Sequence, residues 1–99
     1  MYSVVFKDDA KKDLKEFSSH QQILIAKQLK KIAKSPKLGT PLGNKNGYDL
    51  SGCRKMYADK KQIRIVYKIL DEKIIVEVIA VDKRDEMKVY KKASQRLSK

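Results

Sequence analysis

Apolar and polar residues alternate along two segments in the second half of the chain. Residues 63–69 and residues 74–80 each carry an apolar side chain at every second position. Because successive side chains of a β-strand point to opposite faces of a sheet, this alternation predicts two strands that share one apolar face. A tight turn at residues 71–72 would join them, in a register that pairs Ile65 with Val78.

One hairpin earlier, a turn at residues 59–60 pairs Met56 with Ile63, again apolar against apolar. On the opposite face, the same register sets Lys55 directly across from Arg64. Like charges in opposed positions destabilise a sheet, so stability alone does not favour this pair. Two interpretations remain open. The two long side chains splay apart into solvent, or they form a positive surface that receives a phosphate.

The first part of the chain is predicted to form a short strand and two helices. Residues 1–6 are typical of a strand, and Asp8 or Asp9 can cap a helix that follows with apolar residues at i, i+4 and i+7. Ser19, with Gln22 three positions later, has the form of a capping box at the start of a second helix.

The second helix should end at Ser35-Pro36, because the residue before a proline disfavours helical geometry. The segment from Leu38 to Gly52 holds all four glycines of the chain and Pro41, which predicts a loop. Residues 85–97 return to helical spacing, with Tyr90 on the apolar stripe.

The predicted order is strand, helix, helix, three strands, helix (β-α-α-β-β-β-α). It indicates one small α+β domain over residues 1–99, with a mainly antiparallel sheet and the helices packed on one sheet face. The basic pair would lie on the other face, beside a half-apolar surface formed by Val66, Ile75 and Ile79.

The charge of the chain narrows the possible partners. The 99 residues include 24 Lys and Arg against 12 Asp and Glu, a formal net charge of +12. Such an excess favours a polyanionic partner, because binding releases the counterions of that partner. A basic surface that serves only solubility is the simpler alternative.

Other classes of protein are disfavoured by composition. Cys53 is the one cysteine and His20 the one histidine, so neither an internal disulfide nor a Cys/His metal cluster is expected, and we expect no cofactor. No apolar run approaches the roughly 20 residues needed to span a bilayer. The N-terminus has no basic leader or cleavage site, so we expect a cytoplasmic protein with no membrane partner.

Two segments resemble sequence patterns of RelE-type toxins. Residues 63–69, IRIVYKI, are similar to the strand pattern YRLVYxV, and residues 81–90, VDKRDEMKVY, to the ending VGKRxxxxVY. The paired N-terminal helices, the Ser35-Pro36 stop and the approach Leu50-x-Gly52 also match. The chain therefore resembles the RelE/ParE superfamily of type II toxin–antitoxin systems, in its RelE-like mRNA interferase branch, over nearly its whole length.

The resemblance implies a toxin that enters the ribosomal decoding site and cleaves messenger RNA without a metal. In that chemistry the 2′-hydroxyl attacks the adjacent phosphate, leaving a cyclic phosphate and a free 5′-hydroxyl. By position, the catalytic residues would be Lys55, Arg64, Arg84 and Tyr90. Lys55 and Arg64 would stabilise the phosphorane. Arg84 would support the leaving oxygen, and Tyr90 would stack on or orient a base.

The residues expected to contact RNA are Arg54, Tyr57, Lys68 and Lys83. Tyr57 is a departure from the family pattern, because it stands where the family has a second lysine that often acts as general base. A neutral phenol is a poor base at neutral pH. Either Lys55 takes this role, made easier to deprotonate by the charges of Arg54 and Arg64, or catalysis is weakened.

The implied partners are a cognate antitoxin, the ribosome and messenger RNA. The antitoxin complex would be of higher order and would bind operator DNA through the antitoxin. We expect an acidic, partly disordered antitoxin to fold over the half-apolar face or the basic cleft. Two alternatives remain: a ParE-like toxin that inhibits DNA gyrase without being a nuclease, which Tyr57 keeps open, and a non-catalytic RNA-binding module.

Overall fold

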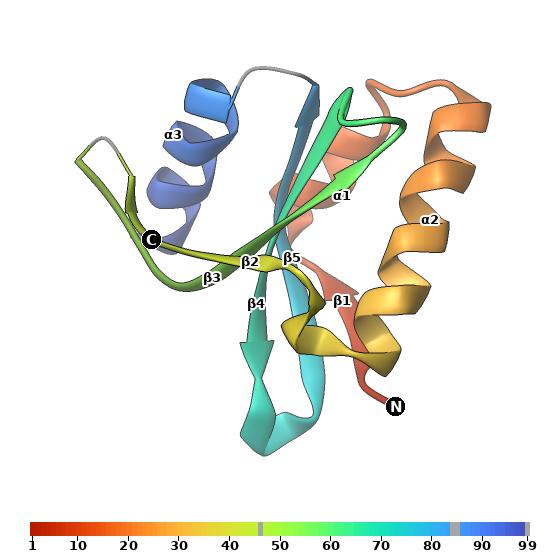
Figure 1. The fold of residues 1–99 in the computed structure, drawn as a ribbon. Helices are drawn as coiled ribbons and strands as arrows, with labels where there is room; N and C mark the ends of the chain where they lie inside the picture. Colours follow the sequence, from red (N-terminus) through yellow and green to blue (C-terminus); the bar gives the residue numbers. More distant parts are fainter. Residues whose placement is uncertain (46, 84–85, 99) are drawn as a thin grey trace.

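The chain folds into a five-stranded mixed sheet that carries helices on both faces (Figure 1). The computed structural model describes residues 1–45, 47–83 and 86–98. In chain order the elements are β1 (Ser3–Phe6), α1 (Asp8–Leu14), α2 (Ser19–Lys34), the short helix η1 (Pro36–Leu38), β2 (Thr40–Lys45), β3 (Tyr48–Ala58), β4 (Ile63–Leu70), the short helix η2 (Asp71–Lys73), β5 (Ile75–Lys83) and α3 (Glu86–Leu97). The predicted α+β class and the order of the predicted elements are confirmed, with one strand added.

The strands lie in the order β1-β5-β4-β3-β2. β1 runs parallel to β5, and the other neighbours are antiparallel. Within the described part of the chain, no helix is long and apolar enough to cross a membrane.

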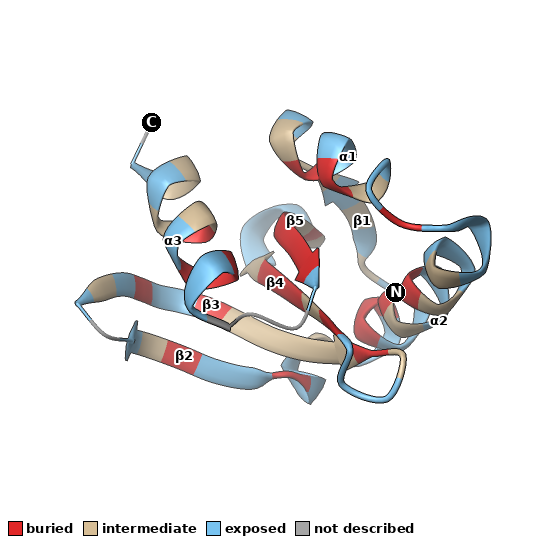
Figure 2. Cartoon of the chain, turned by 90° about the horizontal axis from the view of Figure 1, so that it is seen from above, coloured by how far each residue is buried: buried red, intermediate tan, exposed pale blue. Residues whose placement is uncertain are grey.

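Both faces of the sheet are apolar in its central strands. Ile65 and Val66 are neighbours in β4, both are fully buried, and they belong to different apolar clusters. Helices α1 and α2 cover the face of Ile65, and α3 covers the face of Val66 (Figure 2). This corrects the expectation that the helices share one face. It also removes the half-apolar outer surface expected at Val66 and Ile79, because α3 buries both residues.

A β-bulge in β5 places two consecutive apolar residues on the sheet face that α3 covers. Val66 pairs with Ala80 and Tyr67 with Val78, so Ile79 is an extra residue in β5. Ile79 and Ala80 therefore both belong to the α3 side, and Val81 returns to the side of α1 and α2.

The bulge also changes the register predicted for β4 and β5. Ile65 pairs with Val81, and the expected pairing with Val78 is wrong. The connection contributes to the difference, because η2 and a left-handed Ile74 (φ 55°) take the place of a two-residue turn.

The glycine-rich segment predicted to be a loop instead forms β2 and the first half of β3. Its glycines serve this hairpin. Gly47 (φ 85°) lies between the two strands, and Gly43 (φ 62°) lies at the register shift of β2. Leu42 and Leu50 are buried in the cluster that α3 covers. The segment is therefore a hairpin at the sheet edge with one buried side.

The capping box of α2 lies one residue earlier than expected. Ser18 Oγ accepts a hydrogen bond from the backbone N–H of Gln21 at 3.1 Å, and Gln21 Oε1 accepts one from the backbone N–H of Ser18 at 3.2 Å. Gln22, the expected partner of Ser19, donates instead to the carbonyls of Leu14, the last residue of α1, and of Phe17 in the link. The N-cap of α1 is Lys7, whose side chain makes no capping bond, so the expected aspartate cap is wrong.

A buried tyrosine fixes the segment that leads into β2. The Tyr67 hydroxyl donates to the Pro36 carbonyl at 2.6 Å and accepts from the Gly39 N–H at 2.9 Å. Burial raises the pKa of this hydroxyl, so it stays protonated. A Cβ atom at Gly39 would lie 2.5 Å from Tyr67 Oη and 2.7 Å from the Lys55 carbonyl oxygen, so a larger residue does not fit. These hydrogen bonds fix the start of β2, whose residue Thr40 pairs with Lys55 of β3.

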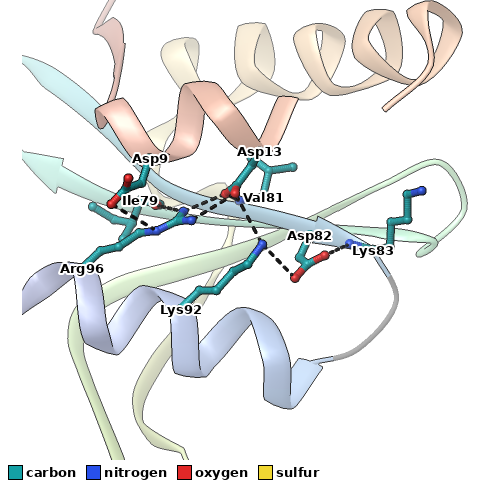
Figure 3. A network of polar contacts seen from close by, with 8 residues as sticks. All are labelled: Asp9, Asp13, Ile79, Val81, Asp82, Lys83, Lys92 and Arg96. Carbon is teal, nitrogen blue, oxygen red and sulfur yellow. Dashed lines mark hydrogen bonds and ion pairs between the residues drawn. The ribbon is translucent and has the colours of Figure 1, made fainter. Parts of the chain in front are cut away.

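The carboxylate of Asp13 connects α1, β5 and α3 (Figure 3). Asp13 is buried, and its Oδ2 accepts hydrogen bonds from the Val81 N–H at 2.9 Å and from Arg96 Nη1 at 2.7 Å. Its Oδ1 accepts from Arg96 Nη2 at 3.0 Å and from Lys92 Nζ at 3.3 Å. The last residue of β1 pairs with Val78, so β1 has no residue opposite Val81. The Val81 N–H therefore donates its hydrogen bond to Asp13 and not to a neighbouring strand.

The network anchors α3 by charge as well as by apolar contact. Lys92 Nζ lies 3.1 Å from Asp82 Oδ2, and Arg96 Nη1 donates to the Ile79 carbonyl at 2.9 Å. Burial alone would raise the pKa of Asp13, but the hydrogen bonds from Arg96 and Val81 outweigh it, and the pKa lies below its ordinary value. The Asp13 hydrogen bond raises the pKa of Arg96 in turn.

Replacing this carboxylate should destabilise the fold in a pH-dependent way. Removing one partner of a buried ion pair costs about 3–5 kcal/mol, and we expect the lower end for Asp13→Asn because the Lys92 side chain is 28% exposed. Folding lowers the pKa of Asp13, so its stabilisation is present above the unfolded pKa of about 3.9 and is lost as the pH falls through the folded value.

Urea unfolding of the wild type and Asp13→Asn at neutral pH and at roughly pH 3 measures this effect. The difference in unfolding free energy should be large at neutral pH and should shrink in acid, where the wild-type carboxyl becomes protonated. A difference that does not change with pH would show that the charge of Asp13 does not anchor α3.

Candidate functional site

Three cationic side chains surround the ring of Tyr57. Lys55 Nζ lies 5.0 Å from the ring centroid, Arg64 Cζ 5.3 Å and Lys61 Nζ 5.7 Å. Lys55 and Tyr57 come from β3, Arg64 from β4 and Lys61 from the turn between them. A cation within about 6 Å of an aromatic centroid is attracted to the ring by roughly 0.5–1 kcal/mol at an exposed site. We call these four residues the Tyr57 cluster.

The register that builds the cluster is shifted by two residues from the predicted one. Tyr57 pairs with Arg64, and Lys55 pairs with Val66, so the expected Lys55–Arg64 pairing is wrong. The turn spans residues 59–62 and is longer than predicted. A shift of two keeps every side chain on its face, so Lys55 and Arg64 do share a face, and both lie over the ring of Tyr57.

The cluster lies on the sheet face that α3 covers in part. Val66, the residue opposite Lys55, is buried in the α3 cluster, whereas Lys55, Tyr57 and Arg64 are half-buried. The site therefore has an apolar wall on one side and solvent on the other. Charges at such a boundary are screened less than charges in bulk water.

The acidic side chain that lies opposite Arg64 in the sheet contacts residues outside the Tyr57 cluster. Asp82 lies opposite Arg64 on β5 and is nearly buried. Its Oδ2 lies 3.1 Å from Lys92 Nζ of α3, and its Oδ1 accepts from the Lys83 N–H at 2.7 Å. The charge of Asp82 is therefore paired with Lys92 of α3.

Two of the expected catalytic residues are not part of this cluster. Tyr90 is 3% exposed and packs among the apolar residues under α3, so a base can reach its ring only if α3 moves. Arg84 lies outside the residues that the structure describes, directly after Lys83 at the end of β5. The expected roles of both residues stay predictions.

The expected RNA contacts lie on both faces of the sheet. Arg54 Nη1 donates to the carbonyls of Lys37 and Gly39, which places it on the side of α2. Lys68 lies opposite Cys53, on the face of the cluster. The exposed Lys83 has its Nζ 5.8 Å from the ring centroid of Phe17, toward α1. Of the four expected contacts, Tyr57 alone belongs to the cluster.

Lys61 and the Asp13 network were missed in the sequence. The predicted turn covers only residues 59–60 and assigns no role to Lys61, although a run of two lysines beside a basic hairpin was the available signal. Asp13 lies on the same helix stripe as Ala10, Leu14 and Phe17. A carboxylate on an apolar stripe is the signal of a buried polar contact, because an ionised group is rarely buried without a partner.

The remaining polar sites offer little chemistry of their own. A hollow of about 480 Å³ beside Asp13 is lined by charged residues of α1, β5 and α3. Among the described residues, no group of three or more His, Cys, Asp or Glu side chains could hold a metal ion. Burial raises the pKa of the Cys53 thiol, which makes it a poor nucleophile. The chemistry that the Tyr57 cluster can perform is the binding of a phosphate and the stabilisation of negative charge.

Comparison with known proteins identifies a family. Residues 4–87 match the family described as the ParE toxin of the type II toxin–antitoxin system parDE. Over 96 residues the chain is 34% identical to a putative RelE-like toxin protein of Escherichia coli and 30% identical to the mRNA interferase toxin RelE of Escherichia coli K12. Each match covers 97% of both proteins.

Solved structures of Escherichia coli RelE share the fold. A doubly substituted RelE in the free state is 28% identical, with a TM-score of 0.76 over 97% of both chains. The toxin in the intact RelBE toxin–antitoxin complex is 26% identical, with a TM-score of 0.67 over 87% of this chain and 100% of that chain. The chain therefore belongs to the ParE toxin family of type II toxin–antitoxin systems, as a RelE-like toxin of the RelE/ParE superfamily.

Proposed function

We propose that this toxin is a ribosome-dependent endoribonuclease that cleaves messenger RNA and thereby inhibits translation. The observation that carries the proposal is the convergence of Lys55, Arg64 and Lys61 on one aromatic ring, at 5.0–5.7 Å. Cations held together at a partly solvated face favour a phosphate ligand. Relatives that are 30% identical carry the name mRNA interferase, which supports the same reaction.

In the proposed reaction the 2′-oxygen attacks the adjacent phosphorus and gives its proton to a base. The bond from phosphorus to the 5′-oxygen then breaks, and the leaving oxygen takes up a proton from water, which leaves a cyclic phosphate and a 5′-hydroxyl. Arg64 binds the non-bridging oxygens, because its planar guanidinium can donate two parallel hydrogen bonds to them. Lys55 acts as the base from the neutral fraction of its side chain, and the ammonium that this proton transfer creates stabilises the phosphorane together with Arg64. Arg84 supports the leaving oxygen.

Tyr57 has a positioning role in this proposal. Its neutral ring attracts Lys55 and Arg64 without adding a further positive charge between them. The two cations are thereby held in the geometry that a phosphate requires before it binds. Tyr90 orients a base only in a ribosome-bound state in which α3 has shifted.

The proposed partners follow from the family and the charge. Escherichia coli RelE has been solved with its antitoxin RelB and with a peptide of it. We infer that an acidic cognate antitoxin neutralises this toxin, whose net charge is +12, in the cytoplasm. The complex would bind operator DNA through the antitoxin. The ribosome would present the messenger RNA to the Tyr57 cluster.

Expression of the toxin alone should stop protein synthesis before DNA synthesis. Incorporation of labelled amino acids and labelled thymidine after induction measures the order. An Arg64→Ala toxin expressed at the same level is the control for the burden of expression. If thymidine incorporation stops first, the toxin acts on DNA gyrase, the alternative that the absence of the second lysine at Tyr57 favours.

Arg64→Ala should reduce single-turnover cleavage of ribosome-bound message by roughly a hundredfold to a thousandfold, the cost of one preorganised donor to a developing oxyanion. Arg64→Lys keeps the charge and should recover part of the rate, because a single ammonium lacks the paired donors. The thermal unfolding of both variants should match the wild type, since Arg64 is not part of either apolar cluster. Wild-type cleavage by a folded Arg64→Ala protein would remove this residue from the mechanism.

Cleavage should need no added divalent metal. The proposed step uses side-chain charges alone, so the rate on ribosomes kept intact with a polyamine should be unchanged in excess EDTA. Titration of Mg²⁺ and Mn²⁺ back into the reaction is the matching control. A rate that rises from zero with the added ion would contradict the proposed mechanism.

A further inference from the structure

The outer edge of β1 offers backbone groups to another strand. β1 lies at one edge of the sheet, and β5 is its neighbour among the described strands (Figure 1). The N–H groups of Ser3 and Lys7 each donate a hydrogen bond of 3.0 Å toward β5. Successive residues of a parallel strand direct their backbone groups to opposite sides. The N–H and C=O groups of Val4 and Phe6 therefore point away from β5, toward the outer edge.

An apolar groove lies along this edge, between β1 and α2. It has a volume of about 520 Å³. Val4 and Phe6 line it from β1, and Leu29 lines it from α2. Lys30 and Lys34 of α2 also line it, and both residues are exposed. The groove therefore combines an apolar lining with two cations that reach solvent. We call it the β1–α2 groove.

The two edges of the sheet differ in their protection against pairing. β2, at the other edge, carries Pro41, Lys45 and a register shift next to Gly43. Proline, lysine and a bulge are features that keep a further strand from pairing with an edge. β1 has the sequence Ser-Val-Val-Phe and carries none of the three, and Val5 on its other face is 43% exposed. The edge without this protection is the one beside the apolar groove.

We propose that the β1–α2 groove binds an extended segment of the antitoxin, which pairs with the outer edge of β1. The backbone of the segment bonds to Val4 and Phe6, and every second side chain enters the groove. Acidic residues of the segment contact Lys30 and Lys34. The inference rests on the acidic antitoxin of the proposed function and is independent of the cleavage reaction.

The charge of α2 favours an acidic protein as the occupant. The helix contains four lysines and neither Asp nor Glu. An acidic chain is attracted to this surface, whereas a second copy of the toxin, with a net charge of +12, is repelled. The half-apolar surface expected for the antitoxin at Val66 and Ile79 is buried under α3, and the β1–α2 groove supplies an apolar lining elsewhere.

Two charge-reversed variants of α2 test the proposal against the antitoxin encoded beside the toxin gene. Lys30→Glu with Lys34→Glu should weaken the complex by about tenfold or more, because two attractions become repulsions. Lys27→Glu with Lys31→Glu makes the same change of charge on the same helix, outside the groove lining, and should weaken it by less than about threefold. Isothermal titration calorimetry measures both affinities. Equal losses in the two variants would overturn the proposal.

A variant that fills the groove tests its apolar lining without a change of charge. Ala26 lines the groove and is exposed, so Ala26→Phe should keep the thermal stability of the wild type and weaken antitoxin binding by about tenfold. Ile23→Phe is the matched control, because Ile23 is exposed on the same helix and lies outside the lining. Loss of affinity in the control alone, or in neither variant, would contradict the proposal.

Hydrogen exchange locates the added strand. The amides of Val4 and Phe6 should exchange at least about tenfold more slowly in the toxin–antitoxin complex than in the toxin alone. Unchanged exchange in the complex would show that the antitoxin binds elsewhere and would refute the proposal. Protection that grows with the concentration of the toxin alone would assign the groove to a second copy, which also refutes it.

These results are separable from the test of the proposed function. If the wild type leaves ribosome-bound message uncut, the endoribonuclease proposal fails, and the affinities and exchange rates still decide the role of the groove. If the wild type cleaves and the antitoxin stops it while Val4 and Phe6 stay unprotected, the function stands and the groove is refuted. An antitoxin that does not bind the toxin at all refutes both the proposed partner and the groove.

Discussion

The position of α3 depends on the compensation of one buried carboxylate. Asp13 lies where α1, β5 and α3 meet, beyond the end of the β1–β5 pairing. An ionised carboxylate with so little contact to water is tolerated only when it is hydrogen-bonded and paired with cations. Arg96 and Lys92 supply those cations, and both belong to α3. The electrostatic requirement of Asp13 therefore selects one position for α3, and that position buries Val66 and leaves the Tyr57 cluster beside the helix.

The Tyr57 cluster differs from this network, because it gathers three cationic side chains around one aromatic ring at a partly solvated face. In the proposed function, side chains that are already held in place need little rearrangement when a phosphate binds, and such preorganisation is the main source of electrostatic catalysis. The free energy that holds the cations in place comes from the surrounding fold. Tyr67 fixes Gly39 at the start of β2, which pairs with β3 at Lys55, and the β3–β4 hairpin carries Arg64 and Lys61.

The sequence predicts the faces of the strands better than their registers. Lys55 and Arg64 were placed on one face correctly, because a shift of two residues does not change parity. The registers depend on backbone features that the side-chain pattern does not carry, such as the extra residue Ile79 in β5. β2 was mistaken for a loop because its glycines were taken as breaks. The apolar stripe of the last helix includes Tyr90 and indicates its burial, whereas the place where α3 docks is not encoded by a local pattern.

The parallel pairing of β1 with β5 sets an order on the assembly of the domain. Ser3 pairs with Ile75, and Asp13 accepts its backbone hydrogen bond from Val81, so the first strand and the first helix find their partners only near the end of the chain. Parallel strands need a long crossover, and such distant contacts form late in folding. The N-terminal strand and helix therefore complete their pairing only after β5 has been synthesised. A chain that lacks β5 would leave β1 without its partner strand and would deprive Asp13 of the Val81 N–H, so the first half of the domain cannot complete its structure alone.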